Sequence, residues 1–394
     1  MLSLKFSIQL FSLSAVISCM KKLLEKLEER KKAGNLRELT SSTGLVDFFS
    51  NDYLGLAKSQ ELFQAIEAEQ KKIRGNINGS TGSRLLSGNN DYVMATEEKL
   101  AKLFNAQKAL LFNSGYSANS SLLSSIPQKD DTIIYDELIH ASLKEGARLS
   151  FAKRFSFRHN DLEDLEQKIK KSTGNCFVVA ESVYSMDGDF CPLEKIISLC
   201  EKYEAYLILD EAHSTGIWGE KGTGIACAHQ LEHKIFARVY TFGKAMGIHG
   251  ACVAGSSLLI DYLINFARPF IYTTALPPHG VASVNAAFDL IEKEVNISKI
   301  LMRRIELFKS EYKKNVEGPW SLGESDSPVQ VLKIPGNDRA RSLASHLIKN
   351  GFDVRAILSP TVKEGEERLR ICLHVYNTEE EIRGLIKTIM NFEL

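Results

Sequence analysis

The stretch "YLILDEAHSTGIWG", Tyr206–Gly219, decides between two very different folds. Its first half is apolar enough for a buried strand, and an acid and a histidine follow directly. The letters DEAH can mark the magnesium-binding box of a helicase, but they can also mark reactive groups at the end of a sheet strand. A helicase also needs a phosphate loop, GxxxxGK[ST], whose amides and lysine cradle the nucleotide. Neither "GEKGTG" nor "TFGKAMG" fits that pattern, so the sequence favours the strand interpretation.

Similar short runs rich in apolar and β-branched residues lie on both sides of this stretch, between about residue 95 and residue 255. They read "ALLFNSG", "DTIIYDE", "RFSFRHND", "CFVVAESVYS", "RVYTFGKA" and "ACVAGS". Helix-like stretches such as Leu193–Tyr203 separate several of them. This alternation predicts an α/β fold with a mainly parallel central sheet and helices on both faces.

Polar side chains follow five of these runs at the point where each predicted strand ends. They lie in Asn113–Gly115, Asp136–His140, Ser185–Gly188, Asp210–His213 and Thr241–Lys244. Ligands of such folds bind at the carboxyl ends of the strands. We therefore expect these groups to meet in one site.

The remaining chain predicts flanking segments around a large domain at 56–285. Residues 1–19 look like an upstream extension or a weak signal-like segment, and 20–55 like an N-terminal helix and arm with Leu23, Leu24, Leu27 and Leu36 on its apolar side. A long helix-like stretch, His279–Asn315, leads into a small α+β domain at 286–394. There "PVQVLKI" and "ERLRICLHV" predict strands, while "RARSLASHLIKNG" and "TEEEIRGLIKTIMNF" predict helices.

Composition argues against several classes of partner. The 49 basic and 49 acidic residues balance, which gives no electrostatic case for nucleic acid. No uninterrupted apolar run reaches the roughly 18 residues of a spanning helix. The seven cysteines show no CxxC spacing, so we expect reduced thiols, a cytoplasmic protein and no metal site.

Pyridoxal phosphate is a cofactor whose needs match these residues. It needs a lysine for a Schiff base, a carboxylate for its pyridine nitrogen, phosphate-binding amides and a flat group against its ring. Asp210 ends an apolar run, and Lys244 follows the next run among small residues. The stretch "NSGYSAN", Asn113–Asn119, predicts a glycine turn opening a helix, which suits a phosphate.

The chain resembles a known family, the α-oxoamine synthases, which belong to the fold-type I pyridoxal-phosphate enzymes. The resemblance runs from about Leu23 to the C-terminus and rests on the order and spacing of several motifs. They are "SNDYLGLA", "GSTGSRLLSGN", "FNSGYSAN", "DELIHASL", "ESVYSMDGD", "LDEAHSTG", "TFGKAMG", "IYTTALPP" and "SPTVKEGEERLRICL". It implies a homodimer with active sites at the interface, in which an amino acid condenses with an acyl thioester and loses carbon dioxide.

The resemblance implies catalytic and cofactor roles for five residues. Lys244 would carry the cofactor and then remove the Cα proton of the substrate. Asp210 would bind the pyridine nitrogen, and His213 the phenol oxygen of the ring. His140 would stack on the ring and assist proton transfer, and Ser185 would support the ring or His140.

Five further residues are implied for the phosphate. The backbone amides of Gly115 and Tyr116 and the hydroxyl of Thr241 would bind it from the same subunit. Thr273 and Thr274 would reach it from the partner subunit.

The substrates are assigned by the same resemblance. Arg370 would hold the carboxylate of the amino acid, since a guanidinium can bind a carboxylate through two hydrogen bonds. Thr361 would contact substrate, and Arg37 would meet a distal carboxylate on the acyl chain. Asn51 and Tyr53 would enter from the partner.

Within the family, the overall match and Arg37 favour L-alanine and a pimeloyl thioester. Two alternatives stay open: glycine or serine with acetyl-CoA or a long-chain acyl thioester, and a plain aminotransferase. The sequence leaves the acyl carrier open between coenzyme A and a carrier protein.

Overall fold

All seven predicted strands are present in the central sheet of the computed structural model, which describes residues 13–37, 39, 44–73, 77–294, 296–315 and 320–392. The strand order is β2-β8-β7-β6-β5-β3-β4, and only β8 runs antiparallel to its neighbours. The strands are β2 (Lys108–Phe112), β3 (Thr132–Asp136), β4 (Lys153–Phe157), β5 (Cys176–Glu181), β6 (Tyr206–Asp210), β7 (Ala237–Thr241) and β8 (Ala251–Gly255). The predicted α/β fold with a mainly parallel sheet is thus confirmed.

Helices cover this sheet on both faces. Along β2, Ala109 and Leu111 belong to one apolar cluster while Leu110 and Phe112 belong to a second one, as expected for side chains that alternate across a sheet. The helices of this part are α2 (Gln60–Gln70), α3 (Asp91–Leu103), α4 (Gly115–Ser125), α5 (Ala141–Leu149), α6 (Leu162–Lys170), α7 (Leu193–Lys202), α8 (Gly224–Ala228), α9 (Ser257–Phe266) and α10 (Arg268–Ile271), with 3₁₀ turns at Leu56–Lys58, Glu220–Gly222 and Glu232–Lys234.

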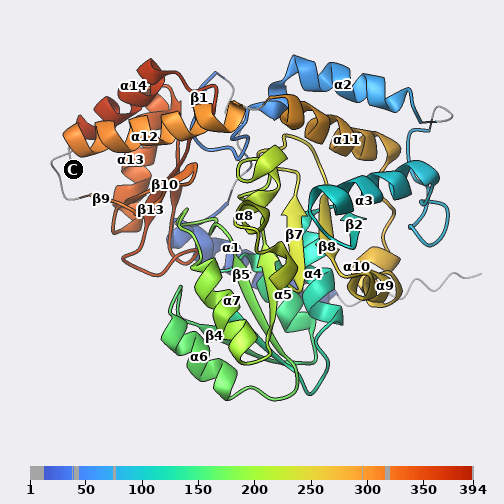
Figure 1. Cartoon of the computed structure of the whole chain (residues 1–394). Helices are drawn as coiled ribbons and strands as arrows, with labels where there is room; N and C mark the ends of the chain where they lie inside the picture. The colour runs from blue at the N-terminus through green and yellow to red at the C-terminus, as the bar shows by residue number, and fades with distance from the viewer. Residues whose placement is uncertain are drawn as a thin grey trace, which may run out of the picture.

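The predicted long helix at His279–Asn315 is wrong in one respect. Two helices, α11 (Pro278–Lys293) and α12 (Ile297–Asn315), occupy this stretch. In Figure 1 α11 lies beside α2, and α12 lies with the C-terminal helices. The division into domains stays a prediction, and its boundary at 285/286 falls inside α11.

A second, antiparallel sheet follows, in the order β12-β13-β10-β9. Its strands are β9 (Ser321–Leu322), β10 (Val329–Lys333), β12 (Arg355–Ile357) and β13 (Arg368–Cys372), and its helices are α13 (Asn337–Lys349) and α14 (Glu379–Met390). The capping box predicted for the last helix is present, because Thr378 and Glu381 each accept a hydrogen bond from the other's backbone amide. Figure 1 shows α12, α13 and α14 around this sheet, apart from the larger one.

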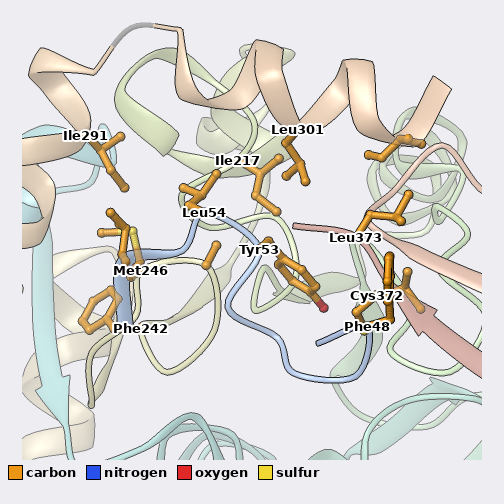
Figure 2. Packing of buried hydrophobic residues seen from close by; sticks show 14 of the residues in the cluster. Phe48, Tyr53, Leu54, Ile217, Phe242, Met246, Ile291, Leu301, Cys372 and Leu373 are labelled. Atoms are coloured by element: carbon orange, nitrogen blue, oxygen red, sulfur yellow. The ribbon is translucent and has the colours of Figure 1, made fainter. Parts of the chain in front are cut away.

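An extended arm joins the two sheets. It begins with β1 (Val46–Asp47), which pairs in parallel with β11 (Phe352–Asp353). Further hydrogen bonds run from Cys372 N to Phe48 O (2.7 Å) and from Val375 N to Tyr53 O (3.0 Å). Figure 2 shows the arm between residues of both regions, with Met246 on one side and Cys372 on the other. These hydrogen bonds therefore place residues 51–53 beside strands of the same chain.

The N-terminal helix α1 spans Leu13–Lys32, so it begins before the predicted start at Met20. Leu23, Leu24 and Leu27 are all more than half exposed, and Leu36 lies beyond the end of the helix. The prediction of an apolar helix side that includes Leu36 is therefore wrong. Residues 1–12 of the predicted extension lie outside the described residues. None of the helices in the described ranges combines the length and apolar composition that a membrane crossing requires.

Candidate active site

Asp210 lies at the carboxyl end of β6 and is buried, with 4% of its surface exposed. One carboxylate oxygen accepts from Ala212 N (2.8 Å), and the other accepts from the side-chain amide of Asn119 (2.7 Å). Two neutral donors thus fix the orientation of the carboxylate. Since Asp210 forms no ion pair with a cationic side chain of the described residues, its carboxylate remains available to a protonated ring nitrogen.

Lys244 follows β7, the strand next to β6, in a turn among small residues. Burial lowers the pKa of the Lys244 amine, and the nearby carboxylates of Asp210 and Glu181 partly oppose that effect. A lysine whose pKa is lowered in this way is more often neutral, and a neutral amine can attack a carbonyl or take up a proton.

His140 is the N-cap of α5 and stands at the mouth of the site. Its Nδ1 contacts the hydroxyl of Ser142 (2.7 Å), and the same hydroxyl accepts from Asn119 Nδ2 (3.0 Å). A chain of hydrogen bonds therefore runs from Asp210 through Asn119 and Ser142 to His140. Burial lowers the pKa of the His140 imidazole, which favours the neutral ring.

Glu181 lies beside Asp210, because the two residues are partners in the pairing of β5 with β6. Its carboxylate accepts from the backbone amide of His140. Burial, reinforced by the charge of Asp210, raises the pKa of Glu181 to about 8. A raised pKa favours the protonated form of Glu181, which limits the repulsion between the two neighbouring carboxyl groups.

A second group of side chains joins His213 to Arg370. The phenol of Tyr53 lies 2.8 Å from His213 Nδ1 and accepts from Arg370 Nη2 at 3.4 Å. Burial lowers the pKa of His213 well below its ordinary value, and the charges of Lys244 and Arg370 act in the same direction. The neutral imidazole keeps its Nε2 free of described protein partners, which suits a hydrogen bond to a ring oxygen.

Arg370, on β13 of the smaller sheet, reaches this site and is held in place there. Its Nε donates to Ser185 O (2.8 Å), and its Nη2 donates to Asn51 Oδ1 (2.9 Å). Ser185 thus supports Arg370 through its backbone carbonyl. Asn51 and Tyr53 contact the site of their own chain, so the expectation that they enter from the partner is wrong. The physical reason is the arm, because its β1 pairs with β11 and its Phe48 O accepts from Cys372 N, the end of β13, within the same chain.

The N-terminus of α4 presents free backbone amides next to the hydroxyl of Thr241. Ser114 and Ser117 cap the helix reciprocally, and helix geometry leaves the amides of Gly115 and Tyr116 without an intrahelical acceptor. The hydroxyl of Thr241 lies so close that a Cβ on Gly115 would be 2.2 Å from it. Glycine therefore lets two amides and one hydroxyl converge, as binding of an oxyanion requires.

Thr273 and Thr274 lie near the same helix start through Asn113, which follows β2. The side-chain nitrogen Nδ2 of Asn113 donates to Thr274 O (2.8 Å) and lies 3.4 Å from the Thr273 hydroxyl oxygen. Their predicted reach into a partner subunit stays a prediction.

Thr361 and Arg37 have different outcomes. Thr361 is exposed and lines a cavity of about 820 Å³ together with His140 and Ser185. Arg37 is exposed, and no hydrogen bond or ion pair within the described ranges connects it to the other candidate residues. The structure thus brings Thr361 to the site and leaves the role of Arg37 without support from contacts.

These groups fit pyridoxal phosphate. The helix start at Gly115 suits an oxyanion, Asp210 offers an oriented carboxylate, and Lys244 offers an amine on the neighbouring strand end. All three lie at one edge of the sheet, where the parallel strands end.

Sequence reasoning missed Asn119, Ser142 and Glu181 as parts of this site. Asn119 stands in the quoted stretch "NSGYSAN", one helical turn after Gly115, and that spacing places it on the same face of α4. The signal was therefore present for Asn119. For Ser142 and Glu181 only the strand pairing and the start of α5 bring the side chains together.

A family model and several known proteins are similar to this chain. The family model "Aminotransferase class I and II" matches residues 43–389. An 8-amino-7-oxononanoate synthase of Emericella nidulans is 39% identical, with 94% of each chain covered. A crystal structure of 8-amino-7-oxononanoate synthase from Francisella tularensis is 30% identical, has a TM-score of 0.75 and covers 88% of this chain and 97% of that one. A serine palmitoyltransferase from S. paucimobilis, solved with a bound PLP–myriocin aldimine, is 25% identical, has a TM-score of 0.84 and covers 95% and 97%.

Proposed function

This chain belongs to the aminotransferase class I and II family, and on that premise we propose that it is a pyridoxal-phosphate-dependent acyltransferase of biotin biosynthesis. In this proposal it joins L-alanine to a pimeloyl thioester, with loss of carbon dioxide, and forms 8-amino-7-oxononanoate. The substrate assignment is carried by one observation, the 39% identity to the Emericella nidulans synthase over almost the whole of both chains. The protein acts as a cytoplasmic homodimer.

Pyridoxal phosphate, when bound, supplies an electron sink that stabilises negative charge at the Cα of the amino acid. The amides of Gly115 and Tyr116 and the hydroxyl of Thr241 hold its phosphate. Asp210 would hold the pyridine nitrogen, and the negative charge of its carboxylate, which two neutral donors orient, would favour the protonated nitrogen. His213 would donate to the phenol oxygen, and His140 would pack on the face of the ring.

Lys244 first binds the cofactor and later moves the Cα proton. Its lowered pKa favours the neutral amine that a general base requires. Arg370 binds the carboxylate of alanine through its guanidinium and orients the Cα–H bond toward Lys244. The contacts of Arg370 with Ser185 and Asn51 fix that orientation before substrate arrives.

The acyl thioester enters from the cavity that Thr361 and His140 line. With the cofactor bound, a new bond would form between the Cα of the amino acid and the carbonyl carbon of the thioester, and the thiol of the carrier would leave. His140 lines this cavity, where its neutral imidazole would donate a hydrogen bond to the carbonyl oxygen as negative charge develops there.

A second candidate is favoured by one observation. The structural match to the serine palmitoyltransferase, with a TM-score of 0.84 over 95% of this chain, exceeds the match to the Francisella synthase, at 0.75 over 88%. In that case serine would condense with a long-chain acyl thioester. The sequence identities, 25% against 39% for the Emericella enzyme, favour alanine.

Product analysis tests the proposal. The purified protein, loaded with pyridoxal phosphate, is incubated with each of alanine, glycine and serine and with pimeloyl-, acetyl- or palmitoyl-CoA. We expect 8-amino-7-oxononanoate from alanine and pimeloyl-CoA only, with one free thiol and one carbon dioxide per product. A Lys244→Ala variant is expected to form none. Product from serine and palmitoyl-CoA but not from alanine would establish the second candidate, and transamination without thiol release would refute both.

A further inference from the structure

Arg238 is a buried cation at the end of the central sheet where β7 begins. The active site lies at the opposite end, where the parallel strands finish. Arg238 is the second residue of β7, only 2% of its surface is exposed, and Thr241 at the other end of the same strand lies beside Gly115. No carboxylate within the described ranges lies within 4 Å of its guanidinium. A buried charge without an opposite charge is unfavourable, so this arrangement requires an explanation.

Its hydrogen bonds occupy one nitrogen alone. Nη1 donates to Phe104 O (2.7 Å), to the hydroxyl of Tyr240 (2.8 Å) and to Cys227 Sγ (3.4 Å). Nε is buried and has no partner, and Nη2 donates to no residue of the described chain. The free edge, Nε with Nη2, is one that binds a carboxylate through two parallel hydrogen bonds.

The contacts of Nη1 also make the guanidinium rigid. Tyr240 stacks on Phe104, with ring centroids 3.7 Å apart and planes inclined by 6°, and Arg238 Cζ lies 5.8 Å from the Tyr240 ring centroid. The free edge is therefore held in one orientation, which lowers the entropy cost of binding a ligand.

A cavity of about 410 Å³ adjoins Arg238. It is formed where β2, β6 and β7 begin and β8 ends, by residues 105–107, 205–207, 232–236 and 255–256. Its size is within the range of small-molecule sites. This edge is one strand length, about 16 Å, from the edge that carries the active site.

Glu232 lines the same cavity and has an unused acceptor. Its Oε1 accepts from Asn105 Nδ2 (3.1 Å), whereas its buried Oε2 has no partner. A ligand that satisfies both free groups carries a carboxylate for Arg238 and a hydrogen-bond donor for Glu232. A ligand with two negative charges is disfavoured, because Glu232 repels the second one.

We propose that this cavity binds a small carboxylate that also carries a hydrogen-bond donor, with its carboxylate on the Nε–Nη2 edge of Arg238 and its donor on Glu232. The site is separate from the active site, and the proposal does not depend on the reaction that the enzyme catalyses.

Glycolate and acetate are the probes, because both carry a carboxylate and only glycolate has a hydroxyl donor. Each is titrated by calorimetry into the full-length protein loaded with pyridoxal phosphate. We expect glycolate to bind about 10-fold more tightly than acetate, since one hydrogen bond to a charged group separates them. In Glu232→Ala the two affinities are expected to become equal within about 2-fold.

Two arginine variants locate the binding. Arg238→Lys keeps the charge and loses the two-donor edge, so glycolate affinity is expected to fall about 10-fold or more. Arg370→Lys changes the arginine of the active site and is expected to leave that affinity unchanged. The opposite pattern, loss in Arg370→Lys and retention in Arg238→Lys, would place glycolate in the active site and overturn the proposal.

A crystal soak keeps the test decisive if Arg238→Lys does not fold. Crystals of the unaltered protein, grown without carboxylate buffers, are soaked in glycolate. We expect density for its carboxylate against Nε and Nη2 of Arg238. A Glu232 carboxylate turned onto Arg238, or ordered water alone in the cavity, would overturn the proposal.

Discussion

Asn119 illustrates how a neutral residue can control charged ones. Its side-chain amide donates to Asp210 and to Ser142, and Ser142 in turn contacts His140. One amide group thus fixes the carboxylate expected at the pyridine nitrogen and the imidazole expected on the ring. Neither Asp210 nor His140 reaches the other directly in the hydrogen bonds of the described residues.

Replacement of Asn119 by alanine is expected to weaken cofactor binding and turnover together, each by about 10-fold, because a hydrogen bond to a charged group is lost. Asn119→Asp is expected to be worse, since it places a second carboxylate against Asp210. Cofactor titration and kcat measurement check this. Ser120→Ala is a matched control on the same helix, because the buried Ser120 hydroxyl has no partner. Equal losses in Ser120→Ala would show a packing effect instead.

Arg370 gives a second prediction at this scale, which concerns the binding of the amino acid. Arg370→Lys is expected to raise the KM for the amino acid by about 10- to 100-fold, because a lysine cannot make two parallel hydrogen bonds to a carboxylate while also holding Ser185 O. The KM for the acyl thioester serves as the internal control. A rise in the acyl KM alone would assign Arg370 to the other substrate.

At the scale of elements, strand ends were easier to predict than contacts between distant segments. The seven strands of the large sheet are apolar runs followed by polar residues, so periodicity and composition were sufficient to identify them. The same signals placed Asp210, His213 and Lys244 at one edge. The break between α11 and α12 was missed, because Glu294–Asn296 contains neither glycine nor proline.

The contacts made by short elements could not be predicted, because so few residues show no sequence pattern. β1 and β11 have two residues each, and their pairing brings Asn51 and Tyr53 to Arg370 of the same chain. A two-residue strand has no periodicity to detect, so the sequence pattern gave no sign of this pairing, and the partner subunit was implied by the family resemblance alone. The exposed position of Arg37 also depends on tertiary placement, which a helix pattern does not reveal.

The start of α4 makes a prediction about an element. In Gly115→Ala the new Cβ would lie 2.2 Å from the Thr241 hydroxyl, so the Thr241 side chain or the start of the helix must shift. We expect a lower Tm and cofactor affinity reduced by about 10-fold or more. The double variant Gly115→Ala/Thr241→Ala removes the clash, so the Tm is expected to recover while the affinity stays low. Recovery of both would mean that Thr241 contributes nothing to phosphate binding.

At the scale of the whole molecule, two kinds of contact hold the site in place. The arm packs Tyr53 and Leu54 between residues of the large sheet region and of the smaller sheet, as Figure 2 shows. Toward the β4 edge of the large sheet, His159, which follows β4, contacts the last residue of β3 and the segment that follows β5. Its Nδ1 lies 3.0 Å from Asp136 Oδ1, and its Nε2 lies 2.8 Å from Asp189 Oδ2.

His159 therefore predicts how the stability of the protein depends on pH. Burial alone would lower the pKa of its imidazole, but the hydrogen bonds and charges of Asp136 and Asp189 outweigh that effect and raise the pKa to about 10. An unfolded histidine titrates near pH 6.5. A group whose pKa is higher in the folded state stabilises that state fully below its unfolded pKa, and the contribution is lost as pH rises toward the folded pKa. The loss is thus expected between about pH 6.5 and 10.

Urea unfolding at a series of pH values tests this expectation in the unaltered protein and in His159→Gln. Because solvent partly screens the half-buried ring, the difference in unfolding free energy between the two proteins is expected to be about 1–3 kcal/mol at pH 6 and to shrink steadily toward pH 10. Taking the difference cancels the titration of tyrosines and cysteines, which both proteins share. Because a glutamine side chain cannot gain a positive charge, a difference that stays constant over this range would mean that His159 is neutral between its two aspartates.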